Sequence, residues 1–420
     1  MMGRAGLPLA LAGIAACASH PIPPSPRPAP DSVSARPAPA RPQLSPRPMR
    51  PPPPPLRRFA PVRLAFVGDI NLGTSTLPDG VPPDTGRGLL ARARAALAGD
   101  MVIGNFEGVL ADTGTSEKCA EILREPPPPP RRAQRHTTTD TTAAVPGCYA
   151  FRTPTALAPR LVEAGFTHLN LANNHANDYG SAGRESTERI LDSLGIRLYG
   201  PLGRIAIDSV RRGDSLTVVG LLGFATYPHS YDLLDIGRSA AVVDSLRPLV
   251  DLLIVTFHGG AEGLRALHVP EAAESLGREP RGDLRRWTRA VIDAGADAVV
   301  GHGPHVLRGI EFYRGKPVVY SLGNFVTYRG FNLEGPRGVT GVLQLEFGPD
   351  RRLRLARLVP MVQHPGEGPA PDPDGAAIDE LRRLSAEDFG PSGARIAADG
   401  VITAADSSLP PPVHPPTDSR

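Results

Sequence analysis

The sequence of 420 residues contains little tryptophan, lysine and cysteine, and it has no long hydrophobic run. One tryptophan, 5% aromatic residues and few lysines provide no basic and aromatic surface of the kind that binds nucleic acid. We therefore expect no nucleic-acid partner. Three cysteines make no Cys-rich zinc pattern. No apolar stretch reaches the length of about 20 residues that a membrane-spanning helix needs.

The net charge of +3 is concentrated in a proline-rich segment near the N-terminus. This segment contains one acidic residue, Asp31, beside Arg27, Arg36, Arg41, Arg47, Arg50, Arg57 and Arg58. The rest of the chain is therefore close to neutral or acidic. Its length is sufficient to bury a large apolar core.

The first residues have the pattern of an export signal. Arg4 precedes the short apolar run "GLPLALAGIAA", and small residues follow. The end of the run, "IAAC", resembles the lipobox of bacterial lipoproteins, which implies removal of residues 1–16 and acylation of Cys17. The alternative is an ordinary signal peptidase site with an incidental cysteine. The lipobox predicts an exported lipoprotein of the bacterial cell envelope, anchored to the membrane by lipid.

Residues 17–61 are rich in proline and arginine and contain "PPPPP" at 51–55. A segment of this composition cannot bury apolar surface, so we expect a disordered, extended linker between the membrane and the folded domain.

The other two cysteines, Cys119 and Cys148, lie in an excursion at 114–150 that lacks a helix or strand period. In an oxidising compartment such a pair is expected to form a disulfide. Two free thiols or a metal-binding pair are the alternatives.

From Val62 to Pro360 the chain alternates short apolar runs with helical stretches, which predicts an α/β domain at 62–360. The predicted strands are "VRLAFVGD", "DMVIGNFE", "FTHLNLANNH", "LTVVGLLGFA", "DLLIVTFHGG", "ADAVVGHGPH" and "KPVVYSLGNF". The predicted helices are "GLLARARAAL", "PTALAPRLVEAG", "GRESTERILDSLG" and "LRRWTRAVIDAGA". Residues 361–420 are expected to form a partly ordered extension with a disordered end.

Polar residues collect where five of the predicted strands end, which is where open α/β sheets bind their ligands. They are Asp69, Asn71, Asn105, Glu107, Asn173, Asn174, His175, Asp178, His258, Glu262, His302 and His305. Any one of them is explained as a turn or cap residue. Together, oxygen and imidazole donors without thiolate favour one or two divalent ions such as Mn, Fe or Zn.

These residues stand in motifs that resemble one family, the CapA proteins of bacterial capsule and poly-gamma-glutamate synthesis, within the calcineurin-like metallophosphatase superfamily. The motifs are "FVGDINLG", "GNFEGVL", "LANNHANDYG", "VTFHGGAE", "GHGPHVLRGIEFYRGKPVVYSLGNF" and "FNLEGP", in the family's order. The resemblance covers roughly Val62 to Pro360. It implies a four-layer αββα sandwich of two sheets flanked by helices, with the site at the strand ends.

Carried over residue by residue, the resemblance implies the metal ligands Asp69, Glu107, Asn174, His258, His302 and His305. It departs from the superfamily at three points. Asn71 replaces the histidine of the usual Asp-x-His motif, and we still include it among the expected ligands. Glu107 replaces a bridging aspartate. The closing pair, His302 and His305, is one residue farther apart than usual.

His175 is expected to protonate a leaving oxygen, with Asp178 orienting its ring. The alternative for Asp178 is a cap on the helix that follows. Asn105, Glu262 and Arg281 are expected to contact substrate, although the "REPRGD" segment of Arg281 also fits a solvated turn.

Two functions follow from these features. The first is a metal-dependent hydrolase of the phosphoesterase type that acts on an anionic envelope polymer or its precursor. The second is a non-catalytic surface protein that binds an acidic polymer and couples it to capsule synthesis or export machinery.

Overall fold

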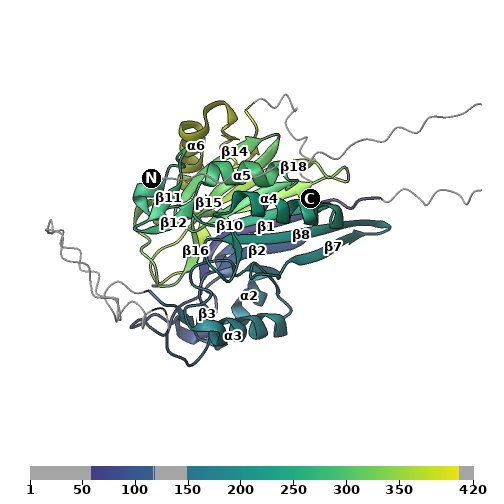
Figure 1. Ribbon diagram of the computed structural model, residues 1–420. Coiled ribbons are helices and arrows are strands. Elements are labelled where there is room, and N and C mark those ends of the chain that lie inside the picture. Colours follow the sequence, from purple (N-terminus) through teal and green to yellow (C-terminus); the bar gives the residue numbers. More distant parts are fainter. Residues whose placement is uncertain (1–57, 117, 119–148, 406–420) are drawn as a thin grey trace, which may run out of the picture. The chain divides into compact units, whose positions relative to one another are not determined.

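Two β-sheets pack face to face in the part of the chain that the computed structural model describes, residues 58–116, 118 and 149–405 (Figure 1). All of these residues belong to the unit Leu56–Arg420.

Sheet 1 has β1 (Val62–Asn71) near its middle, paired in parallel with β2 and β16 and antiparallel to β17. Its path runs β19-β18-β17-β1-β2-β5-β6. The remaining bounds are β2 Met101–Phe106, β5 His168–Asn170, β6 Arg197–Tyr199, β16 Asn324–Thr327, β17 Val339–Phe347, β18 Leu353–Val362 and β19 Ala370–Pro371.

Sheet 2 runs β14-β15-β13-β10-β8-β7, with β9 paired to β8. Its central strands β8, β10, β13 and β15 are parallel, and every residue of β10 is buried. The bounds are β7 Ala206–Arg212, β8 Ser215–Ala225, β9 Tyr231–Asp232, β10 Leu252–His258, β13 Ala298–His302, β14 Leu307–Tyr313 and β15 Lys316–Leu322.

Helices cover the outer face of each sheet (Figure 1). The helices α2 (Pro159–Ala164) and α3 (Gly180–Ser193) share an apolar core with sheet 1, and α4 (Ile236–Leu246) and α5 (Leu284–Asp293) share one with sheet 2. A third core, which includes Phe66 and Ile254, lies between the sheets. The predicted four-layer αββα arrangement is therefore confirmed.

Short elements complete the description. The two-stranded pairs are β3 (Val109–Leu110) with β4 (Arg152–Thr153), β11 (Glu274–Leu276) with β12 (Glu279–Gly282), and β20 (Arg395–Ile396) with β21 (Ile402–Thr403). The 3₁₀ turns are Pro83–Gly86, Ala91–Ala93, Thr155–Leu157, Arg247–Leu249, Leu264–Ala266, Gly335–Gly338 and Gly390–Ser392. Within the described ranges, no helix combines the length and the apolar character needed to cross a membrane.

All seven predicted strand segments contain a strand, and three of the four predicted helical segments contain an α-helix. The fourth, "GLLARARAAL", was wrong as a regular helix: it forms only a 3₁₀ turn at Ala91–Ala93 between other turns. Gly86 and Gly88, which precede this 3₁₀ turn, have positive φ, so the chain does not start a regular helix here. The segment still buries Leu90, Ala93 and Leu97 against sheet 1.

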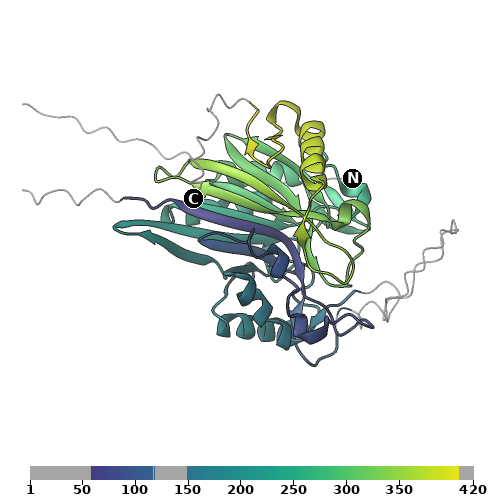
Figure 2. The same ribbon diagram turned by 180° about the vertical axis from the view of Figure 1, so that it is seen from behind.

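The folded region continues past the expected boundary at Pro360. Helix α6 (Ala376–Phe389) packs against β14 and β18, as both views show (Figures 1 and 2), and it adds Ile378 and Leu381 to the core between the sheets. Residues 361–405 are thus part of this body. The expected signal segment, nearly all of the linker, Cys17 and the pair Cys119 and Cys148 lie outside the described residues.

A close backbone approach brings β16 against the end of β1. A Cβ atom at Gly68 would lie 1.9 Å from the carbonyl oxygen of Gly323. The next residue, Asp69, donates its backbone N–H to that same oxygen at 2.9 Å. Glycine at position 68 is therefore what allows Asp69 to sit where the two strands meet.

We predict that Gly68→Ala lowers the free energy of unfolding by about 1–3 kcal/mol or more, because the added methyl group must push β16 away from β1. Urea unfolding measures the change. The matched control is Gly237→Ala in α4, where the nearest atom lies 3.7 Å from the new Cβ and no loss of stability is expected. Equal stability of the two variants would contradict this role of Gly68.

Candidate metal centre

The predicted ligands come together where strands of both sheets end. In sheet 1, Asp69 lies in β1, Glu107 follows β2, and His175 lies in the loop after β5, on three strands that are neighbours in that order. In sheet 2, His258 and His302 are the last residues of β10 and β13 and are register partners. Parallel strands end at the same edge of a sheet, so the side chains of both sheets converge.

The Glu107 carboxylate lies at the middle of this cluster and is completely buried. Its Oε1 atom lies 3.9 Å from His175 Nε2, 3.9 Å from His258 Nε2 and 3.7 Å from His305 Nε2. Three imidazoles thus face one carboxylate oxygen without a hydrogen bond to it.

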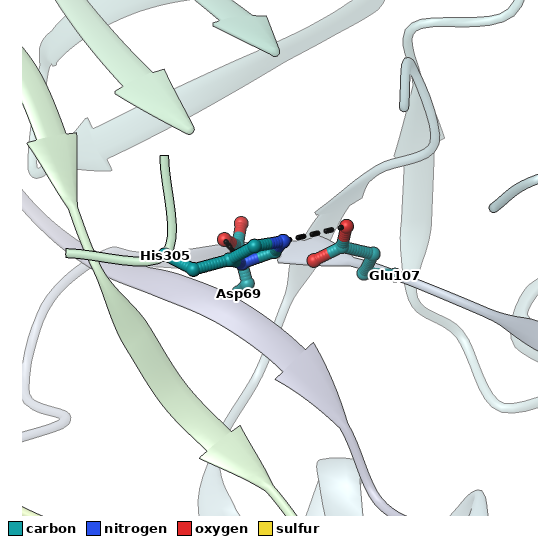
Figure 3. Close-up of side chains that lie close together, drawn as sticks. All are labelled: Asp69, Glu107 and His305. Carbon is teal, nitrogen blue, oxygen red and sulfur yellow. Dashed lines mark ion pairs between the residues drawn. The ribbon is translucent and has the colours of Figure 1, made fainter. Parts of the chain in front are cut away.

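The imidazole of His305 connects Glu107 to the second buried carboxylate, Asp69 (Figure 3). Its Nδ1 atom lies 3.0 Å from Asp69 Oδ2, and His302 Nδ1 lies 3.5 Å from Asp69 Oδ1. Potential ligand atoms of Asp69, Glu107 and His305 all lie within 4.8 Å of one another. His305 reaches this place with a left-handed backbone, φ 57°.

The polar atoms of this cluster lack the partners that buried polar atoms normally have. The described residues contain fourteen buried side-chain nitrogen and oxygen atoms without a hydrogen bond, and eight of them belong to six predicted ligands. The eight are Asp69 Oδ2, Glu107 Oε1 and Oε2, Asn174 Oδ1, His258 Nε2, His302 Nδ1 and Nε2, and His305 Nδ1. Leaving such atoms unpaired is costly, and carboxylate, amide and imidazole donors suit a divalent transition metal. The set fits a metal.

The electrostatics of the cluster lead to the same conclusion. Burial raises the pKa of Glu107 well above its ordinary value. Burial alone would lower the pKa of His305, but the charges of Glu107 and Asp69 outweigh it and raise that pKa to about 10. Glu107 and His305 thus favour bound protons, and a metal cation would take the place of these protons.

His175 and Asp178 form a hydrogen-bonded pair beside the centre. His175 Nδ1 donates to Asp178 Oδ2 at 2.6 Å, which leaves Nε2 facing Glu107. The backbone N–H of Phe151 also donates to Asp178 Oδ2, at 2.7 Å. Helix α3 has Tyr179 at its N-cap without a side-chain cap, so the alternative role of Asp178 as a helix cap is wrong.

Two asparagines of the predicted site hold other residues in place. Asn105 Nδ2 lies 2.9 Å from Asp69 Oδ1 and 3.3 Å from His258 Nδ1, so this buried side chain joins ligands from both sheets. Asn71 donates its amide N–H to the Glu107 carbonyl at 2.9 Å and accepts the N–H of Gly73 at 3.1 Å. Both Asn71 polar atoms are occupied by the backbone, so we remove it from the ligand set.

Glu262 and Arg281 bind each other. Arg281 is completely buried, with Nη2 donating to Glu262 at 2.7 Å and Nη1 to Glu279 at 3.0 Å. Its Nη1 also donates to the hydroxyl of Tyr227 at 2.5 Å. The interpretation of this arginine as part of a solvated turn was wrong. Its charge is balanced within the protein, so it supports the wall of the site and is not a free anion-binding group.

Comparison with known proteins finds similarity over the part of the chain that contains His175, His258, His302 and His305. Residues 134–329 match the model of the bacterial capsule synthesis protein PGA_cap. The PGA biosynthesis protein CapA of Bacillus subtilis is 32% identical over 185 residues, and the capsule biosynthesis protein CapA of Bacillus anthracis is 31% identical over 186. Residues 134–329 of this chain are therefore similar to the CapA proteins.

The aligned regions cover only part of each chain. They comprise 41% of this chain and 45% of the Bacillus subtilis CapA, and 40% and 42% for the Bacillus anthracis CapA, so the chain spans less than half the length of these relatives. Among solved structures, a 5'-nucleotidase precursor from Thermus thermophilus shares 15% identity at a TM-score of 0.38, over 78% of this chain and 59% of that one.

Sequence reasoning missed three side chains around the centre. Lys118 donates to Asp178 Oδ1 at 3.0 Å and lies 3.5 Å from His175 Nδ1. Tyr227 lies beside His258, with ring centroids 6.5 Å apart, and Phe331 packs on His305 at 4.8 Å. Phe331 begins the quoted motif "FNLEGP", which was the one available signal; Lys118 and Tyr227 stand in no strand-exit motif.

We predict that Glu107→Gln lowers the affinity for divalent metal by at least about tenfold, because it removes the charge shared by three imidazoles. Metal content by mass spectrometry after dialysis against limiting Mn, Fe or Zn measures it. His268→Ala is the control, since this exposed histidine pairs with Asp388 away from the centre. Equal metal content in wild type and Glu107→Gln would refute the assignment.

We also predict that Lys118→Met raises the pKa of His175. Burial is the main cause that lowers this pKa, and the Lys118 charge lowers it further while the Asp178 charge raises it. Removing the lysine leaves the carboxylate unopposed, so the imidazole stays protonated to higher pH. An NMR titration of the His175 ring in metal-free protein measures the shift, with Lys316→Met as the control because Lys316 pairs with Asp297. An unchanged or lower pKa would contradict the contact.

Proposed function

We propose that this protein is a metal-dependent hydrolase of the phosphoesterase type that acts in capsule or poly-gamma-glutamate synthesis. The observation that carries the proposal is the convergence of eight buried ligand atoms without a hydrogen bond, from two sheets, beside a His-Asp pair. The names of the CapA relatives supply the capsule context. The substrate class we propose is an anionic envelope polymer or its precursor.

The residues proposed to hold the metal are Asp69, Glu107, Asn174, His258, His302 and His305. When bound, one or two Mn, Fe or Zn ions would supply the positive charge that binds phosphoryl oxygens and lowers the pKa of water. Asn105 holds Asp69 and His258 in fixed relative positions, so the donor set is preorganised.

His175 is the proposed proton donor. Asp178 accepts its Nδ1–H and fixes the ring, which leaves Nε2 free at the side that faces Glu107. Two contacts keep Asp178 in place and ionised, the Phe151 N–H and the Lys118 ammonium group. The pKa of Asp178 is lowered overall: burial alone would raise it, but the charge and hydrogen bond of His175 outweigh that. Because Nδ1–H is bound to Asp178, Nε2 is the one atom at which the ring can take up a further proton and then deliver it.

The proposed location follows the N-terminal sequence: export, acylation of Cys17 and attachment to the envelope membrane, close to capsule synthesis or export machinery. Mass spectrometry of the mature N-terminus tests the acylation directly.

The test of the activity is hydrolysis of bis(p-nitrophenyl) phosphate by the metal-loaded full chain. We predict that His175→Gln lowers kcat by about 10²–10⁴-fold while metal content stays equal to wild type, since Nε2 is not needed to fill the donor set. His268→Ala serves again as the exposed control and should keep full activity.

A metal-loaded wild type that hydrolyses neither this diester nor p-nitrophenyl phosphate would overturn the enzymatic proposal. It would favour the second function, a surface protein that binds an acidic polymer without cleaving it.

A further inference from the structure

A cavity of about 360 Å³ lies between the end of β8 and the first turns of α4. This volume falls in the range of about 300–1,000 Å³ that is typical of small-molecule sites. No residue assigned to the metal centre lines it.

The walls of the cavity are mainly aromatic and aliphatic. Phe224, which is completely buried, packs on Tyr231 with ring centroids 5.7 Å apart, and Val242 contributes from α4. Tyr227 forms a further wall. A flat apolar group would therefore contact carbon atoms on several sides.

Two exposed leucines line the same cavity. Leu202 is 57% exposed and Leu234 is 41% exposed, and they come from separate loops, before β7 and before α4. Exposed apolar side chains scattered singly over a surface are normal, whereas a group of them around a cavity indicates a binding surface.

The polar lining offers one main charged contact. The hydroxyls of Ser230 and Ser239 donate to the carbonyls of Tyr227 and Asp232, and Asp232 Oδ1 accepts the N–H of Leu234. These polar groups are thus engaged in hydrogen bonds with the surrounding backbone. The exposed guanidinium of Arg238 has no ion-pair or hydrogen-bond partner within the described ranges. The cavity therefore presents carbon surface and one free cation, with the single carboxylate of Asp232 nearby.

Tyr227 separates this cavity from the metal centre and is firmly held. Its hydroxyl lies 2.5 Å from Arg281 Nη1 and also bonds to Glu279, and its ring stacks on His229 at 6.1 Å. A wall fixed in this way does not need to rearrange when a ligand binds, so the cavity is preformed.

We propose that this cavity is a binding site for an organic anion with a single negative charge and a flat, largely apolar body. The body packs between Phe224, Tyr227 and Val242, and the anionic group pairs with Arg238. A second negative charge is disfavoured by Asp232. The site binds its ligand without the metal, so it stands whether or not the protein is a hydrolase.

The test uses two probes of equal shape, 2-naphthoate and its uncharged amide, 2-naphthamide. Each is titrated by calorimetry into the full chain in the presence of a chelator, so that anions cannot bind a metal ion. We expect one naphthoate site per chain, with naphthamide binding about two- to fivefold more weakly because it lacks the ion pair with the exposed Arg238.

Three variants locate the site. Val242→Trp fills the cavity and should weaken both probes at least about tenfold, while Val162→Trp, at a 44% exposed position on α2, should change neither. Arg238→Gln should bring naphthoate down to the affinity of naphthamide. Leu234→Glu places a negative charge at an exposed position of the lining and should weaken the binding of naphthoate more than that of naphthamide. This variant tests the site even if Val242→Trp fails to fold.

Absence of naphthoate binding to the wild type would overturn the proposal. So would binding that survives both Arg238→Gln and Leu234→Glu, or binding seen only when metal replaces the chelator. The last result would assign the anion to the metal centre instead.

Discussion

The burial of one carboxylate, that of Glu107, is the constraint around which this structure is organised. A charge removed from water must be compensated nearby, and no hydrogen bond in the described structure compensates this one. Three imidazoles surround it, one at the end of β10 and two in loops. The apolar layers around the sheets fix the distance between those loops. The fold therefore gives up some stability at this point, because it holds a cation-seeking site in its interior.

Because the donors come from both sheets, the centre exists only when the sandwich is assembled. Asn105 is the physical link, since one amide group lies within hydrogen-bonding distance of Asp69 from sheet 1 and His258 from sheet 2. Its carbonyl oxygen in turn accepts N–H groups from Asn170 and Asn173 at 3.1 Å. A network of neutral amides thus sets the position of the charged side chains at the centre.

The sequence was sufficient to predict the sheets and most of the residues that cluster at the strand ends, because buried parallel strands and the polar residues that end them are local patterns. Glu107, His258 and His302 each follow such a strand directly or end it. The sequence could not predict which groups a side-chain amide contacts. Asn71 lies in the same pattern, yet its amide forms hydrogen bonds with the backbone of Glu107 and Gly73. Lys118 was missed for another reason, since its contact with Asp178 spans 60 residues and no motif marks it.

The left-handed backbone of His305 sets a limit on how this site can change. A residue with φ near 57° is held about 1–2 kcal/mol above its relaxed conformation, and glycine is the substitution that would relieve the strain. Glycine would also delete the imidazole that connects Asp69 to Glu107. Backbone preference and chemistry thus select opposite residues at this position. A variant optimised for backbone stability alone would favour glycine here and would lose the connection between the two carboxylates.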